Sequence, residues 1–429
     1  MTPEVKKRIE QIRQGIVPEG YKKGKIGIVP IKWNEVPFST LFTSTSEYTD
    51  DLKQYPLYSL TIEDGITAKT ERYERSHLVK KENSYKVVRP NDYAYNPMNI
   101  RFGAVARHKG DIPVAVSGYY DIFTTVHESD LVFMDSFLTY GPMITYYNKV
   151  STGSLVEKQR VHFSDFLEFS LALPPLEERK KIAEILATQD KAIELQERKI
   201  EELKRFKKGC LEKMFPRKGQ KVPETRFPGF TGDWEQRKLS DLAEKTYGGG
   251  TPTTSNEAYW NGDIPWIQSS DVVDGKLLGV EPRKWITQGG LNNSAAQLIP
   301  ENSIAIITRV GVGKLAFMPY SYATSQDFLS LSKLNVEPFF AVYACYKKLQ
   351  SELNAVQGTS IKGITKDELL AKSIMVPRYA EQQQIGAFFK QLDKLITLHQ
   401  RKLDEMKKQK KALMQLLLTG IVKTKGEVR

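Results

Sequence analysis

The sequence has few cysteines and histidines, and it has no long apolar run. Its 429 residues include two cysteines, Cys210 and Cys345, and five histidines that lack the paired spacing of metal ligands. These counts exclude a disulfide framework and a four-ligand zinc site. No window approaches the roughly 18 apolar residues of a membrane span, and the charged stretch after Met1 is unlike a signal peptide. We therefore expect a cytoplasmic protein.

Recognisable catalytic motifs are also missing. Residues 96–99 (NPMN) lack the second proline and the stacking aromatic of an adenine methyltransferase site, and this stretch is typical of a turn. Residues 311–314 (GVGK) resemble a phosphate-binding loop, but Thr308 stands in place of its first glycine and Leu315 in place of the magnesium-binding hydroxyl. The sequence offers no convincing glycine-rich cofactor loop, and nothing in it indicates catalysis within this chain.

The length and charge point to several domains and an anionic partner. A chain of 429 residues with 40% hydrophobic and 27% charged residues is long enough for two or three globular domains. Lysine and arginine number 63 against 51 acidic residues, and residues 377–429 alone hold 12 basic and 5 acidic residues. This surplus makes an anionic partner a reasonable expectation, although basic helical tails are more often solvated faces.

An internal repeat fixes the expected architecture. Residues 174–215 align without a gap to residues 377–418, at an offset of 203, with 13 identities in 42 positions. Both segments have proline at the start and none in their interior, as expected for one long helix of about 60 Å at 1.5 Å per residue. The repeat therefore predicts two equivalent helices that separate two globular domains.

Apolar residues recur in these helices with the spacing of a coiled coil. Gln189, Gln196 and His399 interrupt this seam, and such polar residues weaken the pairing while fixing its register. The predicted seam consists of Ile182, Leu186, Ile193, Ile200, Leu203, Ile385, Phe389, Leu392, Ile396, Leu403 and Met406.

Two weaker echoes extend the repeat. The segment from Trp33 to Leu41 corresponds to the segment from Trp234 to Leu242, at the start of each globular domain. Gly15-Ile-Val, after a short helix at 3–13, matches Gly420-Ile-Val after the C-terminal helix. If the chain ends lie together, the repeats form a pseudo-twofold circular arrangement of domain, helix, domain and helix.

Each globular domain is expected to mix helices and strands. Strands are predicted at 85–88, 114–116, 304–307 and 329–331, and a helix at 337–353. The fold class is therefore α+β, with two related domains and two long antiparallel helices. The expected boundaries are an N-terminal helical segment at 1–17, domain one at 18–173, the central helix at 174–216, domain two at 217–376 and the C-terminal helix at 377–429.

On these features the chain resembles the specificity subunits of type I restriction-modification systems, the HsdS family. The most specific motifs are residues 248–252 (GGGTP), 262–271 (GDIPWIQSSD), 357–363 (QGTSIKG), 374–377 (IMVP) and 381–383 (EQQ). The resemblance covers essentially the whole chain. The first half departs from the pattern at 173–179 (LPPLEER) and 151–154 (STGS).

The resemblance implies a non-catalytic reader of DNA. In that family each globular domain is a target recognition domain that reads one half of a bipartite sequence. The paired helices set the spacing and bind two methyltransferase subunits, through which restriction subunits join the complex. The resemblance thus implies no cofactor in this chain, with S-adenosylmethionine, ATP and magnesium expected only in partner subunits.

A DNA reader needs arginine, amide or hydroxyl side chains that reach base edges. We expect Trp266 to lie in the core rather than stack on a base, and we expect only a minority of the candidates to touch bases. Asp271 fits the cap of a turn as well as a base contact. The candidates are Tyr58, Ser59, Thr61, Arg101, Arg107, His108 and Lys109 in the first domain, and Gln268, Ser269, Ser270, Asp271, Arg309, Lys314 and Gln326 in the second.

Other interpretations stay open from sequence alone. Leu195, Phe206, Leu398 and Leu416 lie outside the seam, where they would receive methyltransferase helices or pack on the globular domains of the same chain. The chain also fits a specificity module of another phage-defence or type II-like methylase. From other classes, it fits a structural spacer with two ligand-binding domains, or an independent enzyme.

Overall fold

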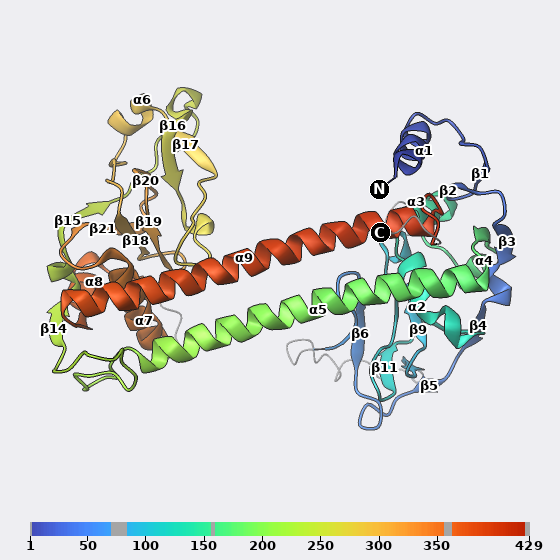
Figure 1. Cartoon of the computed structure of the whole chain (residues 1–429), viewed down its shortest axis with the longest axis horizontal. Coiled ribbons are helices and arrows are strands. Elements are labelled where there is room, and N and C mark those ends of the chain that lie inside the picture. The colour runs from blue at the N-terminus through green and yellow to red at the C-terminus, as the bar shows by residue number, and fades with distance from the viewer. Residues whose placement is uncertain (1, 70–83, 156–158, 356–362, 425–429) are drawn as a thin grey trace. The chain divides into compact units, whose positions relative to one another are not determined.

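The structure is a computed structural model that describes residues 2–69, 84–155, 159–355 and 363–424. The chain divides into two compact units, which are described separately. The first unit comprises residues 1–195 and 404–429, and the second comprises residues 196–403. Each unit therefore contains one part of helix α5 (Leu176–Lys213) and one part of helix α9 (Tyr379–Leu418), as Figure 1 shows.

The globular part of the first unit is built on short antiparallel strands. Its largest sheet has four strands in the order β10-β9-β12-β4, and a second has the order β11-β8-β5. The strands are β1 (Tyr21–Gly24), β2 (Gly27–Pro30), β3 (Asn34–Pro37), β4 (Phe42–Thr45), β5 (Tyr48–Thr49), β6 (Tyr58–Thr61), β7 (Gly65–Ala68), β8 (Tyr85–Val88), β9 (Tyr93–Tyr95), β10 (Val105–Arg107), β11 (Val114–Ser117), β12 (Asp121–Thr125) and β13 (Ser170–Leu173). The shorter helices are α1 (Pro3–Arg13), α2 (Leu131–Phe137), α3 (Gly141–Val150) and α4 (Phe163–Leu167).

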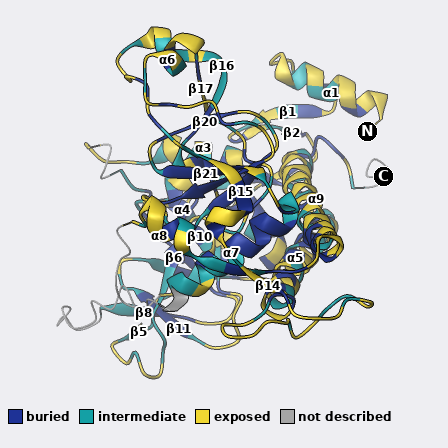
Figure 2. Ribbon diagram, turned by 90° about the vertical axis from the view of Figure 1, so that its left-hand side faces the viewer, coloured by how far each residue is buried: buried dark blue, intermediate teal, exposed yellow. Residues whose placement is uncertain are grey.

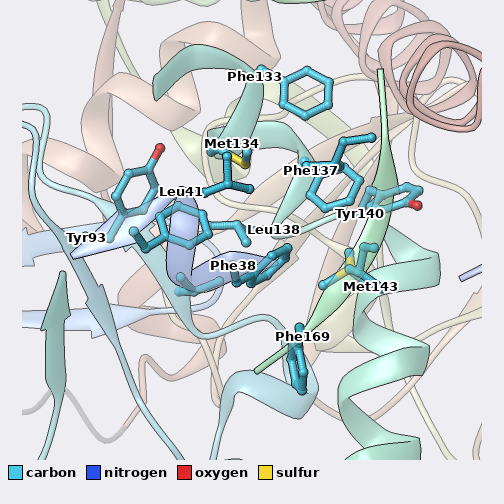
Figure 3. Close-up of a cluster of buried hydrophobic side chains, with 14 of the residues drawn as sticks. Phe38, Leu41, Tyr93, Phe133, Met134, Phe137, Leu138, Tyr140, Met143 and Phe169 are labelled. Carbon is cyan, nitrogen blue, oxygen red and sulfur yellow. The ribbon is translucent and has the colours of Figure 1, made fainter. Parts of the chain in front are cut away.

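Aromatic side chains dominate the core of this unit (Figure 3). The ring of Phe38 lies 5.3 Å from that of Phe42 and 5.1 Å from that of Phe166, both in edge-on arrangements that favour aromatic pairs. Leu417 and Leu418, at the end of α9, belong to the same buried cluster. The C-terminal end of the chain is therefore part of the core of the N-terminal domain.

Glycines end the helices at both chain termini of the first unit. Gly15 follows α1 with φ +76°, and Gly420 follows α9 with φ +67°, the left-handed conformation that terminates helices. A Cβ atom at Gly420 would lie 2.6 Å from Pro30 and 2.8 Å from Trp33, so this position also requires the absence of a side chain. The hydroxyl of Tyr21 donates to the Gly420 carbonyl over 2.8 Å. The sequence echo between the two ends thus corresponds to two helix stops.

The second unit has a similar composition of elements. Its main sheet has the order β15-β21-β18-β19, and a smaller sheet has the order β17-β16-β20 with β16 and β20 parallel. The strands are β14 (Glu235–Lys238), β15 (Ala243–Gly248), β16 (Trp260–Ile267), β17 (Lys284–Ile286), β18 (Ser303–Ile307), β19 (Leu315–Met318), β20 (Ala323–Thr324), β21 (Phe328–Leu334) and β22 (Ser373–Val376). The helices besides α5 and α9 are α6 (Gln288–Asn292), α7 (Pro338–Ala355) and α8 (Lys366–Ala371).

The core of the second unit lies between its main sheet, α7 and the long helices. Strand β18 is buried throughout, and most of β21 is buried, as its dark blue ribbon in Figure 2 shows. Phe340 of α7 packs against Phe215 and Trp234, and the α9 residue Phe389 packs against Phe215 in the same cluster. By contrast, α1 of the first unit is mostly exposed, with Val5 its buried residue.

The elements confirm the expected α+β class. Strands β8, β11, β18 and β21 cover the predicted strand positions, and α1 and α7 cover the predicted short and medium helices. The offset of 203 also relates the helix starts, Leu176 and Tyr379, and the strands that precede them, β13 and β22. The sequence repeat and these elements of the structure therefore share the same offset to the residue.

Polar contacts between α5 and α9 repeat with the same offset. In the second unit Lys207 of α5 pairs with Asp393 of α9 at 2.6 Å, and in the first unit Asp190 of α5 pairs with Lys410 of α9 at 2.5 Å. These pairs, and the 2.8 Å contact of Gln196 with His399 in the second unit, run antiparallel along the helices. The predicted antiparallel pairing is confirmed within each unit.

The start of each long helix is fixed by a buried charge. Glu381 is fully buried and accepts two hydrogen bonds of 2.7 Å from Arg226. Gln382 donates to the Pro377 carbonyl, and Arg179, its equivalent in the first repeat, donates to the Pro174 carbonyl. The departure of the first half from the family pattern at Arg179 therefore preserves this contact.

The two equivalent ion pairs predict unequal costs of substitution. Asp393 lies in a buried network in which Lys207 and the Tyr343 hydroxyl both donate to it, whereas the side chain of Asp190 is 50% exposed. Asp393→Asn should lower the free energy of unfolding by about 3 kcal/mol, because it leaves a buried ammonium without its counter-charge. Asp190→Asn should cost about 0–1 kcal/mol. Urea denaturation of the two variants measures both values, and equal costs would contradict the assigned burial.

Candidate nucleic-acid interface

Loops that carry the candidate residues of the second unit lie next to one another. They follow β15, β16 and β18 and connect β20 to β21. Backbone hydrogen bonds join them: Gly250 N to Thr324 O (2.8 Å), Ser325 N to Ile267 O (2.9 Å), Thr308 N to Asp327 O (2.7 Å) and Ile364 N to Thr308 O (2.8 Å). Motif residues that are far apart in the sequence, between positions 248 and 364, thus form one region of the unit.

The glycines of this region are required by close packing. A Cβ atom at Gly249 would overlap the Ser325 carbonyl, and one at Gly250 would overlap the backbone of Ala295. At Gly262 it would lie 2.6 Å from the Ile286 carbonyl oxygen. The glycine-rich motifs at 248–252 and 262–271 therefore allow backbone segments to approach each other.

The segment 268–271 is a single turn at the end of β16. The Asp271 carboxylate accepts a 3.0 Å hydrogen bond from the Gln268 amide, so Asp271 caps the turn, and its side chain is buried. Gln268 and Ser269 are half-buried, and Ser270 is exposed. Of the two roles that the sequence allows for Asp271, the structure shows the cap of a turn.

The other candidates of this unit are more accessible. Arg309 is exposed, beside Val310, which is 70% exposed, and Lys314 is half-buried. Gln326 is exposed, and its side-chain oxygen accepts a 2.7 Å hydrogen bond from the Thr251 hydroxyl. Trp266 is buried, and its indole donates to the Gly250 carbonyl over 3.0 Å, which confirms its expected place in the core.

Two basic candidates of the first unit share one acidic partner. Arg107 donates to both Asp135 oxygens, at 2.8 to 3.2 Å, and Lys109 lies 3.4 Å from the same carboxylate. Hydrogen bonding to Asp135 raises the pKa of Arg107, and burial raises the pKa of Tyr93, which also donates to Asp135. Much of the positive charge in this cluster is therefore compensated within the unit.

The remaining candidates of the first unit differ in accessibility. His108 is buried, with Nε2 2.7 Å from the Ile112 carbonyl, so it is poorly placed to reach a base. Arg101 is half-buried, donates to Gln159 and lies over the exposed ring of Phe102. Residues 96–99 form the expected turn, in which the Asn96 side chain accepts from the backbone of Met98 and Asn99.

Tyr58, Ser59 and Thr61 lie together on the hairpin of β6 and β7. Tyr58 and Ser59 are half-buried, and Thr61 is exposed at the turn, where its hydroxyl accepts from the Asp64 amide. The hairpin presents the end of Thr61 to solvent. The structure thus places these three residues on one hairpin of the first unit.

The predicted seam residues lie on the inner side of the helix pair. Eight of the eleven are buried, and the side chains of Leu203, Ile396 and Met406 are half-buried. Outside the seam, Leu195, Phe206 and Leu398 are 52%, 56% and 51% exposed, and Leu416 is half-buried. These three exposed side chains are therefore not packed on the globular domains of the described chain.

Sequence reasoning missed three accessible residues. Arg283, directly before β17, is an exposed arginine that pairs with Asp271, and Phe102 and Val310 are exposed apolar residues that follow Arg101 and Arg309. The repeated pattern of arginine, apolar residue and glycine was a usable signal for the last two, since Gly103 and Gly311 both adopt positive φ. For Arg283 no sequence pattern singles out the contact.

Within the described residues, no group of three or more histidine, cysteine, aspartate or glutamate side chains is arranged to hold a metal ion. In the same part of the chain, no helix combines the length and apolar character of a membrane span.

A family model settles the class of this chain. The model described as the type I restriction modification DNA specificity domain matches residues 136–205 and 231–408, more than half of the chain. The chain belongs to this family. Both matched segments include parts of the long helices and the strands that precede them, β13 and β22.

Relatives within the family match either most of the chain or part of it. The putative type I restriction enzyme MjaX specificity subunit of Methanocaldococcus jannaschii is 25% identical over 98% of this chain and 93% of its own length. The EcoR124I/EcoR124II specificity subunit of Escherichia coli is 31% identical over 39% of this chain and 42% of its own length. The first of these relatives shares the full length of the repeat.

Solved structures show the same fold. A chain from a study of complex assembly and conformational transition of the type I R-M system covers 92% of this chain and 99% of its own, with a TM-score of 0.56 and 18% identity. The type I S subunit of M. genitalium covers 92% of this chain and 99% of its own, with a TM-score of 0.55 and 11% identity. At these identities the likeness concerns the fold alone.

Membership of the specificity family supports the expectation that this chain has no catalytic centre of its own.

The motif at 357–363 is only partly described. Residues 357–362 lie outside the described residues, and Gly363 and Ile364 adjoin Thr308. The described end of this motif therefore meets the region built from the other motifs.

The packing of the glycine loop gives a matched pair of substitutions. Gly250→Ala should destabilise the second unit by about 1–3 kcal/mol, because the added methyl group meets backbone atoms that cannot move aside. Gly248→Ala, two residues earlier, faces open space and should change stability by well under 1 kcal/mol. Thermal unfolding of both variants tests the pair; a tolerant Gly250 would show that the loop packs differently.

Proposed function

We propose that this chain is the sequence-reading subunit of a type I restriction-modification complex and that each globular domain reads one half of a bipartite DNA target. The observation that carries the proposal is the meeting of the family motifs around exposed polar side chains in the second unit. Arg309, Gln326 and Ser270 are exposed there on loops tied together by backbone hydrogen bonds. Amide, hydroxyl and guanidinium groups are the ones that recognise base edges.

The repeat supports a divided target. Two related domains, each preceding an equivalent strand and helix, are suited to two separate stretches of DNA. The helices α5 and α9 would then determine how far apart the half-sites lie. The first unit presents Thr61, Arg101 and the exposed Lys109 for its half-site, while Arg107 is engaged by Asp135.

The repeat also supports two copies of a methyltransferase partner. Leu195 and Leu398 are equivalent positions of the two helices, and both are exposed apolar side chains. Exposed leucines on otherwise polar helices favour helical partners. In this proposal two modification subunits bind the helices, and restriction subunits join through them.

Catalysis is assigned to these partners. S-adenosylmethionine would be bound by the methyltransferase subunits, and ATP and magnesium by the restriction subunits. This chain would contribute double-stranded DNA recognition and assembly. The segments 1–173 and 216–376 carry 22 basic against 21 acidic and 18 basic against 16 acidic residues, so partners would supply much of the phosphate contact.

The experiment is to coexpress the chain with the methyltransferase of its own system and to map methylated adenines by single-molecule sequencing. We expect a split motif that is present with this chain and absent without it. A stable complex without any motif would contradict the reading function. The absence of a complex would favour a structural spacer with two ligand-binding domains, and methyl transfer by the isolated chain would identify an enzyme.

A further inference from the structure

Arg283 is an accessible arginine that pairs with the capped turn of the proposed DNA-reading region. It directly precedes β17, an edge strand of the sheet β17-β16-β20, in which Lys284 pairs with Trp266 of β16. The ammonium of Lys284 turns to the rings of Trp260 and Trp266, 5.5 and 5.9 Å from their centres. The side chain of Arg283 is instead 68% exposed and pairs with Asp271.

Asp271 is a buried carboxylate in which one of the two oxygens accepts no hydrogen bond from the described residues. Its Oδ2 accepts the hydrogen bond from the Gln268 amide, while Oδ1 is 3.5 Å from Arg283 Nε and accepts no hydrogen bond within the described residues. The carboxylate side chain is fully buried, so its negative charge is held in place by the turn. A fixed buried charge beside a long exposed side chain orients that side chain.

The contrast with Arg107 shows what is distinctive about Arg283. Arg107 uses Nε and Nη2 for Asp135 and Nη1 for Asn91, so its whole guanidinium is engaged. Arg283 contacts Asp271 through Nε, and its two terminal nitrogens make no hydrogen bond to any residue that the structure describes. The two terminal nitrogens, Nη1 and Nη2, are therefore available to a ligand.

We propose that Arg283 reads a guanine in the half-site of the second unit and that Asp271 is the positioning residue that aims it. This inference rests on the proposed DNA-reading function. The terminal nitrogens of an arginine match the O6 and N7 acceptors on the major-groove edge of guanine, and this pairing is the commonest specific contact to DNA bases. The neighbouring exposed residues, Ser270 and Trp285, place Arg283 at the accessible edge of the region.

A base contact and a phosphate contact by Arg283 make different predictions for a lysine. Lysine keeps the charge but is a point donor without the planar fork. A phosphate contact would tolerate Arg283→Lys, whereas a guanine contact would lose discrimination with Arg283→Lys almost as strongly as with Arg283→Ala. The lysine variant therefore separates the two roles at one position.

The test maps methylated motifs and measures methylation rates on matched oligonucleotides for the assembled complex. We expect Arg283→Lys and Arg283→Ala to reduce the preference for guanine at one position of one half-site by about tenfold to a hundredfold. The other half-site and the spacing should be unchanged. Asp271→Asn should relax the same position less strongly. Arg237→Ala removes a half-buried arginine that is paired with Glu235 on β14; it is the control and should leave the motif unchanged.

Other results would overturn the inference. If Arg283→Lys behaves as wild type while Arg283→Ala weakens methylation at all sequences equally, Arg283 is a phosphate contact. If neither variant changes the motif, Arg283 does not touch DNA. A wild-type complex without a split motif would instead refute the proposed function itself, so the two failures are distinguishable. Because Arg283 is exposed, its variants are expected to fold even if Asp271→Asn does not.

Discussion

The antiparallel pairing of α5 with α9 is the interaction on which the rest of the structure depends. The first unit packs Leu186 of α5 together with Leu417 of α9, and the second unit packs Leu211 of α5 in one cluster with Phe389 of α9. Each core therefore needs one end of each helix. Because the helices belong to different repeats, neither globular domain obtains its core from a continuous half of the chain.

Duplication explains why equivalent polar contacts between α5 and α9 occur in both repeats, although their contributions to stability differ. Asp190 and Asp393 are equivalent and both pair with a lysine of the opposite helix, but only Asp393 lies in a buried network. Arg179 takes over the carbonyl contact that Gln382 makes in the second repeat. The repeats thus keep the helix starts and pairing geometry while the loops diverge, which is the pattern expected when a scaffold is constant and its ligands differ.

The sequence was sufficient to predict features that depend on periodicity and local chemistry. The heptad spacing and the offset of 203 predicted both long helices, and β-branched runs predicted strands such as β8 and β18. Pairings between distant side chains had no such signal: Asp135 neutralises Arg107 from 28 residues away, and the exposure of Arg283 depends on how β17 meets the turn at Asp271. Side-chain accessibility at the reading region therefore required the tertiary structure.

The central claim is that each repeat carries its own reader and that the helices join two independent readers. Replacing residues 243–372 by the matching segment of a relative with a known target tests it directly, because the exchange leaves β14, β22, α5 and α9 in place. The account predicts that one half of the methylated motif changes to that of the donor, with the other half and the spacing retained. A change in both halves, or in neither, would contradict it.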